Sequence, residues 1–158
     1  MQKHSLRTDG KIRVGDPKLA ARLNKELEGN VLFDKFSRGR YSTDASIYQI
    51  EPIGTVVPMS NADVERTINI AKDEGIPILP RGGGTSQCGQ VLGEALIIDT
   101  SKQLNRILEF DAETKTIEVE PGVVLDDLNR MLKPHKLFFP VDISTGSRAT
   151  IGGMAGNN

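Results

Sequence analysis

Nine of the sixteen glycines of this 158-residue chain fall in two short stretches, residues 82–93 and residues 146–156. In the first stretch, Arg81 is followed by three consecutive glycines and then by Thr85 and Ser86. Glycine reaches backbone conformations closed to other residues and lets a ligand approach the main chain. Successive N–H groups can then form a nest that binds anions, with the two hydroxyls as further donors. A diphosphate is the natural ligand of such a loop, and Arg81 adds positive charge.

The second stretch, residues 144–158, offers hydroxyls, backbone donors and a predicted helix start near Thr150. The dipole of that helix also favours an anion. A glycine triplet is most often a flexible turn, so that alternative stays open for either stretch taken singly. Neither stretch contains G-x-x-x-x-G-K-[ST], and the first lacks G-x-G-x-x-G with a helix directly behind it. The residues alone therefore indicate a nucleotide or dinucleotide binder and no more specific class.

Composition excludes several other classes of function. Apolar residues make up 37% of the chain and charged residues 26%, with a formal net charge of −1, which is typical of a soluble globular protein without a nucleic-acid footprint. The single cysteine, Cys88, excludes an internal disulfide and a cysteine-ligated iron–sulfur cluster within this chain. His4 and His135 are far apart, which argues against a histidine-based metal centre. No run reaches transmembrane length and no signal peptide is apparent, so we expect a cytoplasmic protein.

The N-terminal third of the chain carries weak signals for secondary structure. Residues 1–16 are polar and predict a loose arm. A helix is predicted over 17–28, with Pro17 at its start and leucines on one stripe. Residues 30–52 are interpreted as loops around a short helical piece.

The signals become sharper from residue 54 onward. Thr55–Val57 predicts a strand, and Ser60 with Asp63 has the spacing of a capping box at the start of a helix that ends at Gly75. Ile76–Leu79 predicts the next strand, with Pro77 placing its start or an edge there. This succession favours a βαβ unit.

Three short extended runs and a helix follow the first glycine stretch. The runs are residues 95–99, 106–110 and 116–120, with a hairpin turn at 111–115 between the last two. Leucines in register predict a helix over 124–132. The predicted fold class is α+β, with mixed short strands and flanking helices.

Four ordered motifs resemble one known family. They are Pro80–Ser86, Val119–Val124, Leu137–Asp142 and Ala149–Gly153. Together they resemble the FAD-linked oxidoreductases of the vanillyl-alcohol-oxidase type, in the branch of glycolate oxidase and of D-lactate and D-2-hydroxyglutarate dehydrogenases. The resemblance covers residues 38–158 as the N-terminal part of a PCMH-type FAD-binding domain, with residues 1–37 as an arm and helix before it.

The resemblance implies two α+β subdomains that hold an extended FAD between them. The loop Arg81–Ser86 would wrap the pyrophosphate, and the strip Pro140–Gly153 would run along it toward the flavin ring. The implied cofactor-binding residues are Arg81, Gly82, Gly83, Gly84, Thr85, Ser86, Pro140, Ser144, Thr145, Gly146, Ala149, Thr150, Ile151, Gly152, Gly153, Gly156 and Asn157. Some relatives attach FAD through a histidine where Thr85 stands, so we expect non-covalent FAD.

The implied activity is oxidation of a D-2-hydroxy acid to a 2-oxo acid. The family's catalytic bases lie in a substrate domain beyond the matched motifs, so the catalytic residues are unknown and this domain is expected as a partner in cis or in trans. An electron acceptor could bring the enzyme to the inner face of the membrane. A non-catalytic nucleotide-binding or interaction module with the same fold is the alternative, and a relative in cell-wall precursor reduction fits the motifs less well.

Five other residues and one basic cluster have interpretations that the sequence leaves open or favours as structural. Tyr41 and Asp44 either approach the flavin or serve packing and capping, and Arg148 either faces a phosphate or is solvated. Cys88 is interpreted as an inert thiol and His135 as a turn residue. The basic cluster that contains Arg40 is interpreted as a solvated loop.

Overall fold

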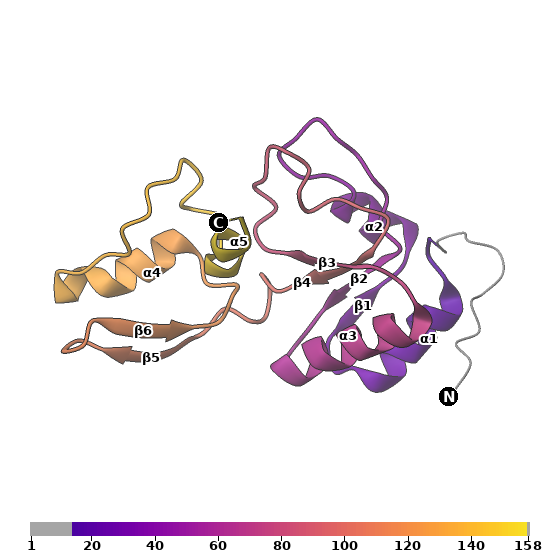
Figure 1. The fold of residues 1–158 in the computed structure, drawn as a ribbon, viewed down its shortest axis with the longest axis horizontal. Coiled ribbons are helices and arrows are strands. Elements are labelled where there is room, and N and C mark those ends of the chain that lie inside the picture. The colour runs from indigo at the N-terminus through magenta and orange to yellow at the C-terminus, as the bar shows by residue number, and fades with distance from the viewer. Residues whose placement is uncertain (1–13, 158) are drawn as a thin grey trace.

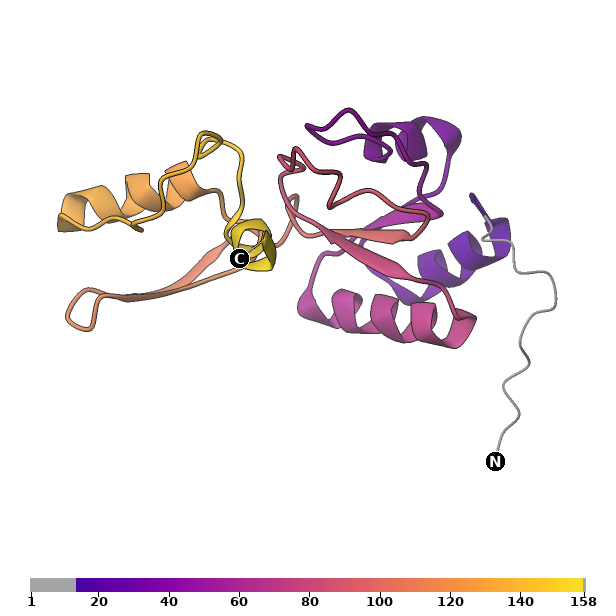
Figure 2. The same ribbon diagram turned by 45° about the horizontal axis from the view of Figure 1, so that its top comes forward.

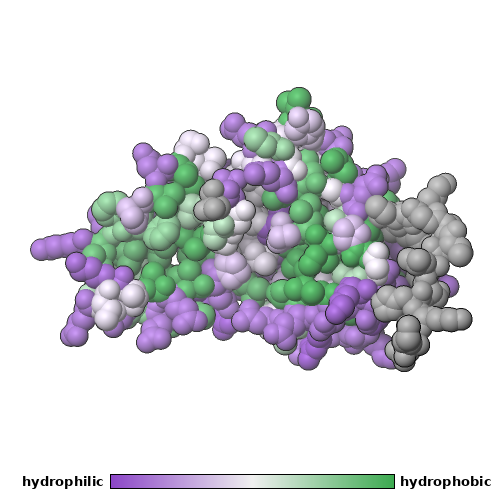
Figure 3. All heavy atoms as spheres, viewed as in Figure 1, coloured by the Kyte–Doolittle hydropathy of each residue, from purple (hydrophilic) through white to green (hydrophobic). Residues whose placement is uncertain are grey.

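The chain folds into two lobes, each with its own core (Figure 1). The computed structural model describes residues 14–157, so most of the arm predicted over residues 1–16 lies outside the described residues. The first lobe is built on a four-stranded sheet and the second on a two-stranded hairpin. On the face shown in Figure 3, hydrophobic side chains gather over both lobes.

The sheet of the first lobe has the strand order β1-β2-β4-β3. Its strands are β1 (Asn30–Leu32), β2 (Gly54–Val57), β3 (Ile78–Arg81) and β4 (Leu96–Asp99). β2, β3 and β4 are parallel, while β1 pairs antiparallel with β2. The central strands β2 and β4 are buried along their whole length, as their β-branched and apolar runs predict.

Three helices cover the two faces of this sheet. α1 (Pro17–Glu26) and α3 (Asn61–Glu74) lie together on one face, and α2 (Lys35–Tyr41) lies on the other (Figures 1 and 2). Asp16 caps α1 by accepting from the backbone N–H groups of Lys18 and Leu19. The buried core beneath α1 and α3 consists of Leu19, Leu23, Leu27, Ile53, Val56, Ile70, Ala71 and Leu96. The predicted boundary between residues 37 and 38 stays a prediction. α1 and β1 lie before this boundary, but they belong to the same lobe as the strands that follow it.

Asp63 does not complete the capping box that the sequence predicts. Ser60 caps α3 by accepting from the N–H of Asp63. The Asp63 carboxylate instead accepts from the N–H groups of Glu28, Gly29 and Met59, at 3.0, 2.8 and 3.0 Å. This buried side chain therefore fixes the connection from α1 to β1 against the start of α3, a long-range role that a local motif cannot indicate.

The second lobe follows the order predicted from the sequence. β5 (Ile107–Asp111) and β6 (Thr116–Val119) form an antiparallel hairpin that α4 (Leu125–Leu132) covers, followed by the 3₁₀ turn η1 (Lys133–His135) and by α5 (Ile151–Asn157). Its buried core is Val123, Leu128 and Leu132, against which Phe110, Ile117, Val119, Met131, Leu137 and Ile151 pack. The observed fold confirms the predicted α+β class.

Two sequence predictions need correction within the first lobe. Residues 30–52 contain a strand, β1, besides the predicted helical piece, because only pairing with β2 makes these three residues extended. The strand predicted over 76–79 begins two residues later, at Ile78, and lies at the edge of the sheet as its prolines require.

Candidate functional site

The first glycine stretch leaves the sheet at the carboxyl end of its parallel strands. β3 ends at Arg81, and the loop Gly82–Ser86 follows directly. In open α/β sheets, ligands bind outside the carboxyl ends of the strands. The five N–H groups of this loop donate no hydrogen bond to any residue that the structure describes. Gly84 has a φ of 67°, which a residue with a side chain adopts only with strain. The loop thus has the free donors that a diphosphate needs.

The two glycine-rich stretches meet at this loop. A Cβ at Gly82 would overlap Thr150 Oγ1 and lie 3.3 Å from the Cα of Gly153. A Cβ at Gly83 would overlap the carbonyl oxygen of Arg148. The absence of side chains therefore serves contact between the two lobes as well as the approach of a ligand. The structure brings together the parts of the chain that the sequence assigned to one site.

Four of the predicted site residues hold the second stretch to its own lobe. Ala149 and Thr150 are buried, and Thr150 Oγ1 accepts from the N–H of Gly153 at 3.2 Å. The N–H of Ile151 donates to Val123 and that of Gly152 to Pro121, both at 2.8 Å. These contacts set the start of α5 beside Gly82.

The remaining predicted residues of the second stretch are more accessible. Pro140, Ser144, Gly153, Gly156 and Asn157 are exposed, and Thr145 and Gly146 are half-buried. A Cβ at Gly146 would lie 2.7 Å from a carboxylate oxygen of Asp126, so this glycine allows the loop to pack on the start of α4. The accessible members are the ones free to contact a ligand.

Arg81 and Ser86 have structural partners that the sequence did not indicate. The Arg81 guanidinium donates to the carbonyl oxygen of Thr43 at 2.9 Å and lies over the ring of Tyr41, 5.4 Å from its centroid. The Ser86 hydroxyl donates to Gln90 at 2.8 Å and accepts from the N–H of Cys88 at 3.2 Å. Both side chains therefore shape the loop and leave its backbone N–H groups as free donors.

A buried pair between Tyr41 and Asp99 lies behind the loop. The Tyr41 hydroxyl donates to Asp99 Oδ2 at 2.7 Å, and the N–H and hydroxyl of Ser101 donate to Oδ1 at 2.8 and 2.6 Å. Burial of the phenol, reinforced by the hydrogen bond to Asp99, raises the pKa of Tyr41 well above its ordinary value. The sequence analysis missed Asp99, and the signal available was a carboxylate that ends a wholly apolar strand.

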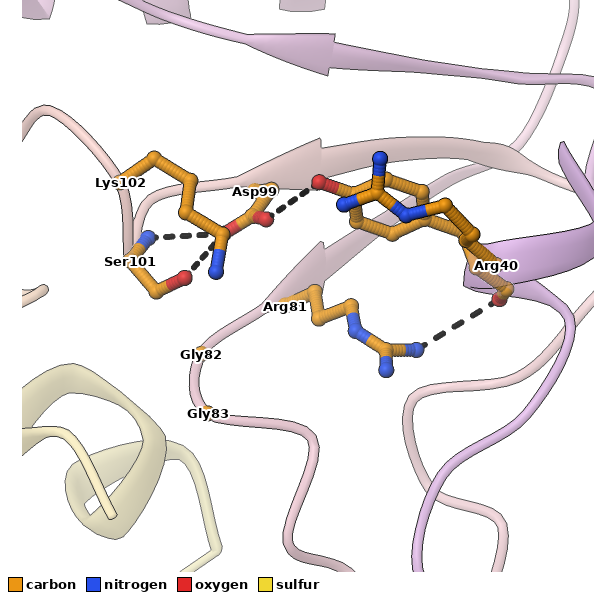
Figure 4. A pocket seen from close by; sticks show the side chains of 8 residues that line it. Arg40, Arg81, Gly82, Gly83, Asp99, Ser101 and Lys102 are labelled. Carbon is orange, nitrogen blue, oxygen red and sulfur yellow. Dashed lines mark hydrogen bonds between the residues drawn. The ribbon is translucent and has the colours of Figure 1, made fainter. Parts of the chain in front are cut away.

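A small hollow opens between this pair and the loop (Figure 4). Its volume is about 130 Å³. It is lined by Arg40, Tyr41, Arg81, Gly82, Gly83, Asp99, Ser101 and Lys102. The lining thus contains three cationic side chains, Arg40, Arg81 and Lys102. Its one carboxylate, Asp99, already accepts hydrogen bonds at both oxygens.

A loop of free N–H groups follows a parallel strand, and the glycine-rich second stretch, from the other lobe, packs against this loop. This arrangement defines a dinucleotide-binding fold of two lobes. The chain belongs to the FAD-binding domain family, whose sequence model matches residues 52–158. The resemblance to the FAD-linked oxidoreductases is therefore confirmed, and FAD is the cofactor that this domain binds. The free donors of Gly82–Ser86 fit its diphosphate.

Relatives of this chain include enzymes of 2-hydroxy-acid metabolism. It is 40% identical over 139 residues to D-2-hydroxyglutarate dehydrogenase of Pseudomonas putida, covering 86% of this chain and 14% of that protein. It is 47% identical over 116 residues to the Escherichia coli protein of the same name, covering 72% and 11%. It is 36% identical over 137 residues to glycolate oxidase subunit GlcD of Bacillus subtilis, covering 84% and 29%. The chain spans less than a third of each of these relatives.

Solved structures show the same fold. Alkyldihydroxyacetonephosphate synthase aligns with a TM-score of 0.76 at 22% identity, over 87% of this chain and 31% of that one. Wild-type BBE-like 1 of Physcomitrella patens aligns with a TM-score of 0.73 at 22% identity, over 87% and 30%. These likenesses confirm the PCMH-type fold predicted from the motifs. Among residues 14–157, no helix has the length and apolar character needed to cross a membrane.

Proposed function

We propose that this chain is the N-terminal, FAD-binding portion of a dehydrogenase that oxidises a D-2-hydroxy acid to the 2-oxo acid. The observation that carries the proposal is the loop of five free N–H groups packed against the second glycine stretch. Support for the substrate class comes from relatives named for D-2-hydroxyglutarate and glycolate. D-lactate is also a D-2-hydroxy acid, and this chain is 34% identical over 105 residues to a D-lactate dehydrogenase of Saccharomyces cerevisiae.

The proposed binding site divides the work between the two lobes. The backbone of Gly82–Ser86 would hold the diphosphate through its five free N–H groups. The accessible residues Pro140, Ser144, Thr145, Gly146 and Gly153 would line the cofactor on the other side, with Gly156 and Asn157 further along α5. Bound FAD would supply the two-electron acceptor for removal of the hydrogen at C2 of the hydroxy acid. Thr85 offers no covalent link, so we propose that FAD binds non-covalently.

The substrate domain and its catalytic bases would come from outside residues 1–158, in cis or in trans. The relatives are three to nine times longer than the part that this chain covers, which supports such a partner. A cytoplasmic location, with contact to the inner face of a membrane through an electron acceptor, also stays a proposal.

Reconstitution tests the proposed function. The chain would be mixed with FAD and with the separately produced C-terminal remainder of the Escherichia coli relative. We expect reduction of an artificial electron acceptor by D-2-hydroxyglutarate, D-lactate or glycolate, and none by the L-enantiomers of the first two. FAD binding without turnover under any of these conditions would favour the alternative, a nucleotide-binding module without catalysis.

A further inference from the structure

The hollow behind the glycine loop contains two cations without an anionic partner. Arg40 lies near the end of α2, and Lys102 lies in the turn after β4. Neither forms an ion pair with a described residue. Figure 4 shows both side chains bordering the same hollow as Gly82 and Gly83.

The two features that would repel an anion already accept hydrogen bonds from other groups. The Asp99 carboxylate accepts from Tyr41 at one oxygen and twice from Ser101 at the other, and its side chain is buried. The carbonyl groups at the end of α2 carry the negative end of the helix dipole. Arg81 approaches this end, where it donates to Thr43 O at 2.9 Å. Arg40 and Lys102 are therefore left with a surplus of positive charge between them.

The size of the hollow limits what it can hold. Its volume of about 130 Å³ is well below the roughly 300 Å³ at which pockets for whole small molecules begin. A single phosphate group is small enough for such a space. Gly82 and Gly83 also line the hollow, and their N–H groups have no acceptor among the described residues.

We propose that Arg40, Lys102 and the N–H groups of Gly82 and Gly83 form a binding site for a single phosphate group. Two sources share this chemistry, one phosphate of the FAD diphosphate and a free phosphate dianion. The first source rests on the proposed cofactor site and extends it to two side chains outside both glycine-rich stretches. In this site Arg40 would bind phosphate, whereas the sequence placed it in a basic cluster interpreted as a solvated loop.

The test is calorimetric titration of the full 158-residue chain with inorganic phosphate, ADP, riboflavin and FAD. The variants are Arg40→Gln and Lys102→Gln, with Lys35→Gln as the control because it removes an exposed charge at the other end of α2. Loss of a charge-assisted hydrogen bond predicts about tenfold weaker binding of phosphate and ADP in each test variant. Binding in the control and of riboflavin should not change. All three side chains are exposed, and thermal unfolding checks that the variants fold.

Each outcome decides the proposal. Unchanged phosphate and ADP affinities in both variants, or no phosphate binding by the natural chain, would overturn it. If ADP displaces phosphate, the cofactor's diphosphate is the source, and if both bind together, the site takes a separate anion. FAD binding that survives in both variants with unchanged affinity refutes the cofactor as the source of the phosphate and leaves the FAD domain intact. Phosphate binding that depends on Arg40 in a chain that does not bind FAD supports the site and contradicts the proposed function.

Discussion

Gly83 lies so close to Arg148 that a Cβ at position 83 would overlap the carbonyl oxygen of Arg148. The two residues are 65 positions apart and belong to different lobes. A neighbouring contact joins Gly82 to Thr150 and Gly153. The geometry of the proposed FAD site therefore depends on backbone contact between the lobes, and the loop glycines are needed for that contact.

Gly83→Ala is expected to destabilise the chain, because the new methyl group meets a backbone atom that cannot rotate away. Overpacking of this kind costs about 1–3 kcal/mol. Urea unfolding measures it. The control is Gly39→Ala in α2, where nothing lies within 4 Å of the added Cβ. It should raise stability by about 0.5–1 kcal/mol, since alanine favours helix over glycine. Equal stabilities for the two variants would contradict the close contact at Gly83.

Asp63→Ala should be among the most destabilising single changes in the first lobe. It removes the acceptor for three backbone N–H groups, those of Glu28, Gly29 and Met59. Three part-buried donors left without this acceptor make the expected loss about 3 kcal/mol in the free energy of unfolding. Glu65→Gln, an exposed change on the same helix, is the control and should have little effect. A loss below that of an average surface substitution would show that water replaces this carboxylate.

Tyr41→Phe should change how stability depends on alkaline pH. The folded state raises the pKa of Tyr41, so the unfolded chain loses this proton first, and stability falls as pH rises above about 10, the ordinary value of a phenol. The variant should lose this component and be less stable at neutral pH by about 1–2 kcal/mol, through the lost hydrogen bond to Asp99.

The other tyrosine provides the control for this experiment. Tyr48 is 54% exposed, and Tyr48→Phe should keep the alkaline loss of stability. Chemical unfolding at a series of pH values from neutral to 11 would measure it. The same alkaline slope in Tyr41→Phe as in the natural chain would refute the role of the buried phenol.

Glu120→Gln should alter the acid side of the stability profile. Hydrogen bonds from the Arg106 guanidinium, at 3.1 and 2.7 Å, lower the pKa of the Glu120 carboxyl. The contribution of this pair is therefore complete above about 4.5, the carboxyl's ordinary value, and disappears as pH falls through the lower pKa of the folded state. The natural chain should be more stable than the variant at neutral pH, and this difference should disappear in acid. Glu118→Gln, an exposed change on β6 just before Glu120, should show no such difference.

The sequence predicted those parts of the fold that local patterns determine. The start of α1 at Pro17, the cap Ser60, the stop at Gly75 and the hairpin turn at Lys115 all act within a few residues of the elements that they bound. β1 was missed because three residues without alternation become a strand only through β2.

The same distinction holds at the site. Consecutive glycines and the order of four motifs indicated the FAD-binding domain from local sequence. The partners of Arg81, the pairing of Tyr41 with Asp99 and the hollow between Arg40 and Lys102 depend on residues that are 38 to 62 positions apart. The periodicity and the spacing of residues in the sequence carry no information on such contacts, so they are seen only in the folded chain.

The most direct test of the central claim is a titration of the 158-residue chain with FAD and with riboflavin, followed by flavin absorbance after gel filtration and after acid precipitation. If the loop Gly82–Ser86 holds the diphosphate against the second stretch, FAD stays with the folded chain, riboflavin does not, and acid releases the FAD. The Gly83→Ala variant should lose FAD while Gly39→Ala retains it. Retention of riboflavin as firmly as FAD, or undiminished FAD binding by Gly83→Ala, would contradict the account.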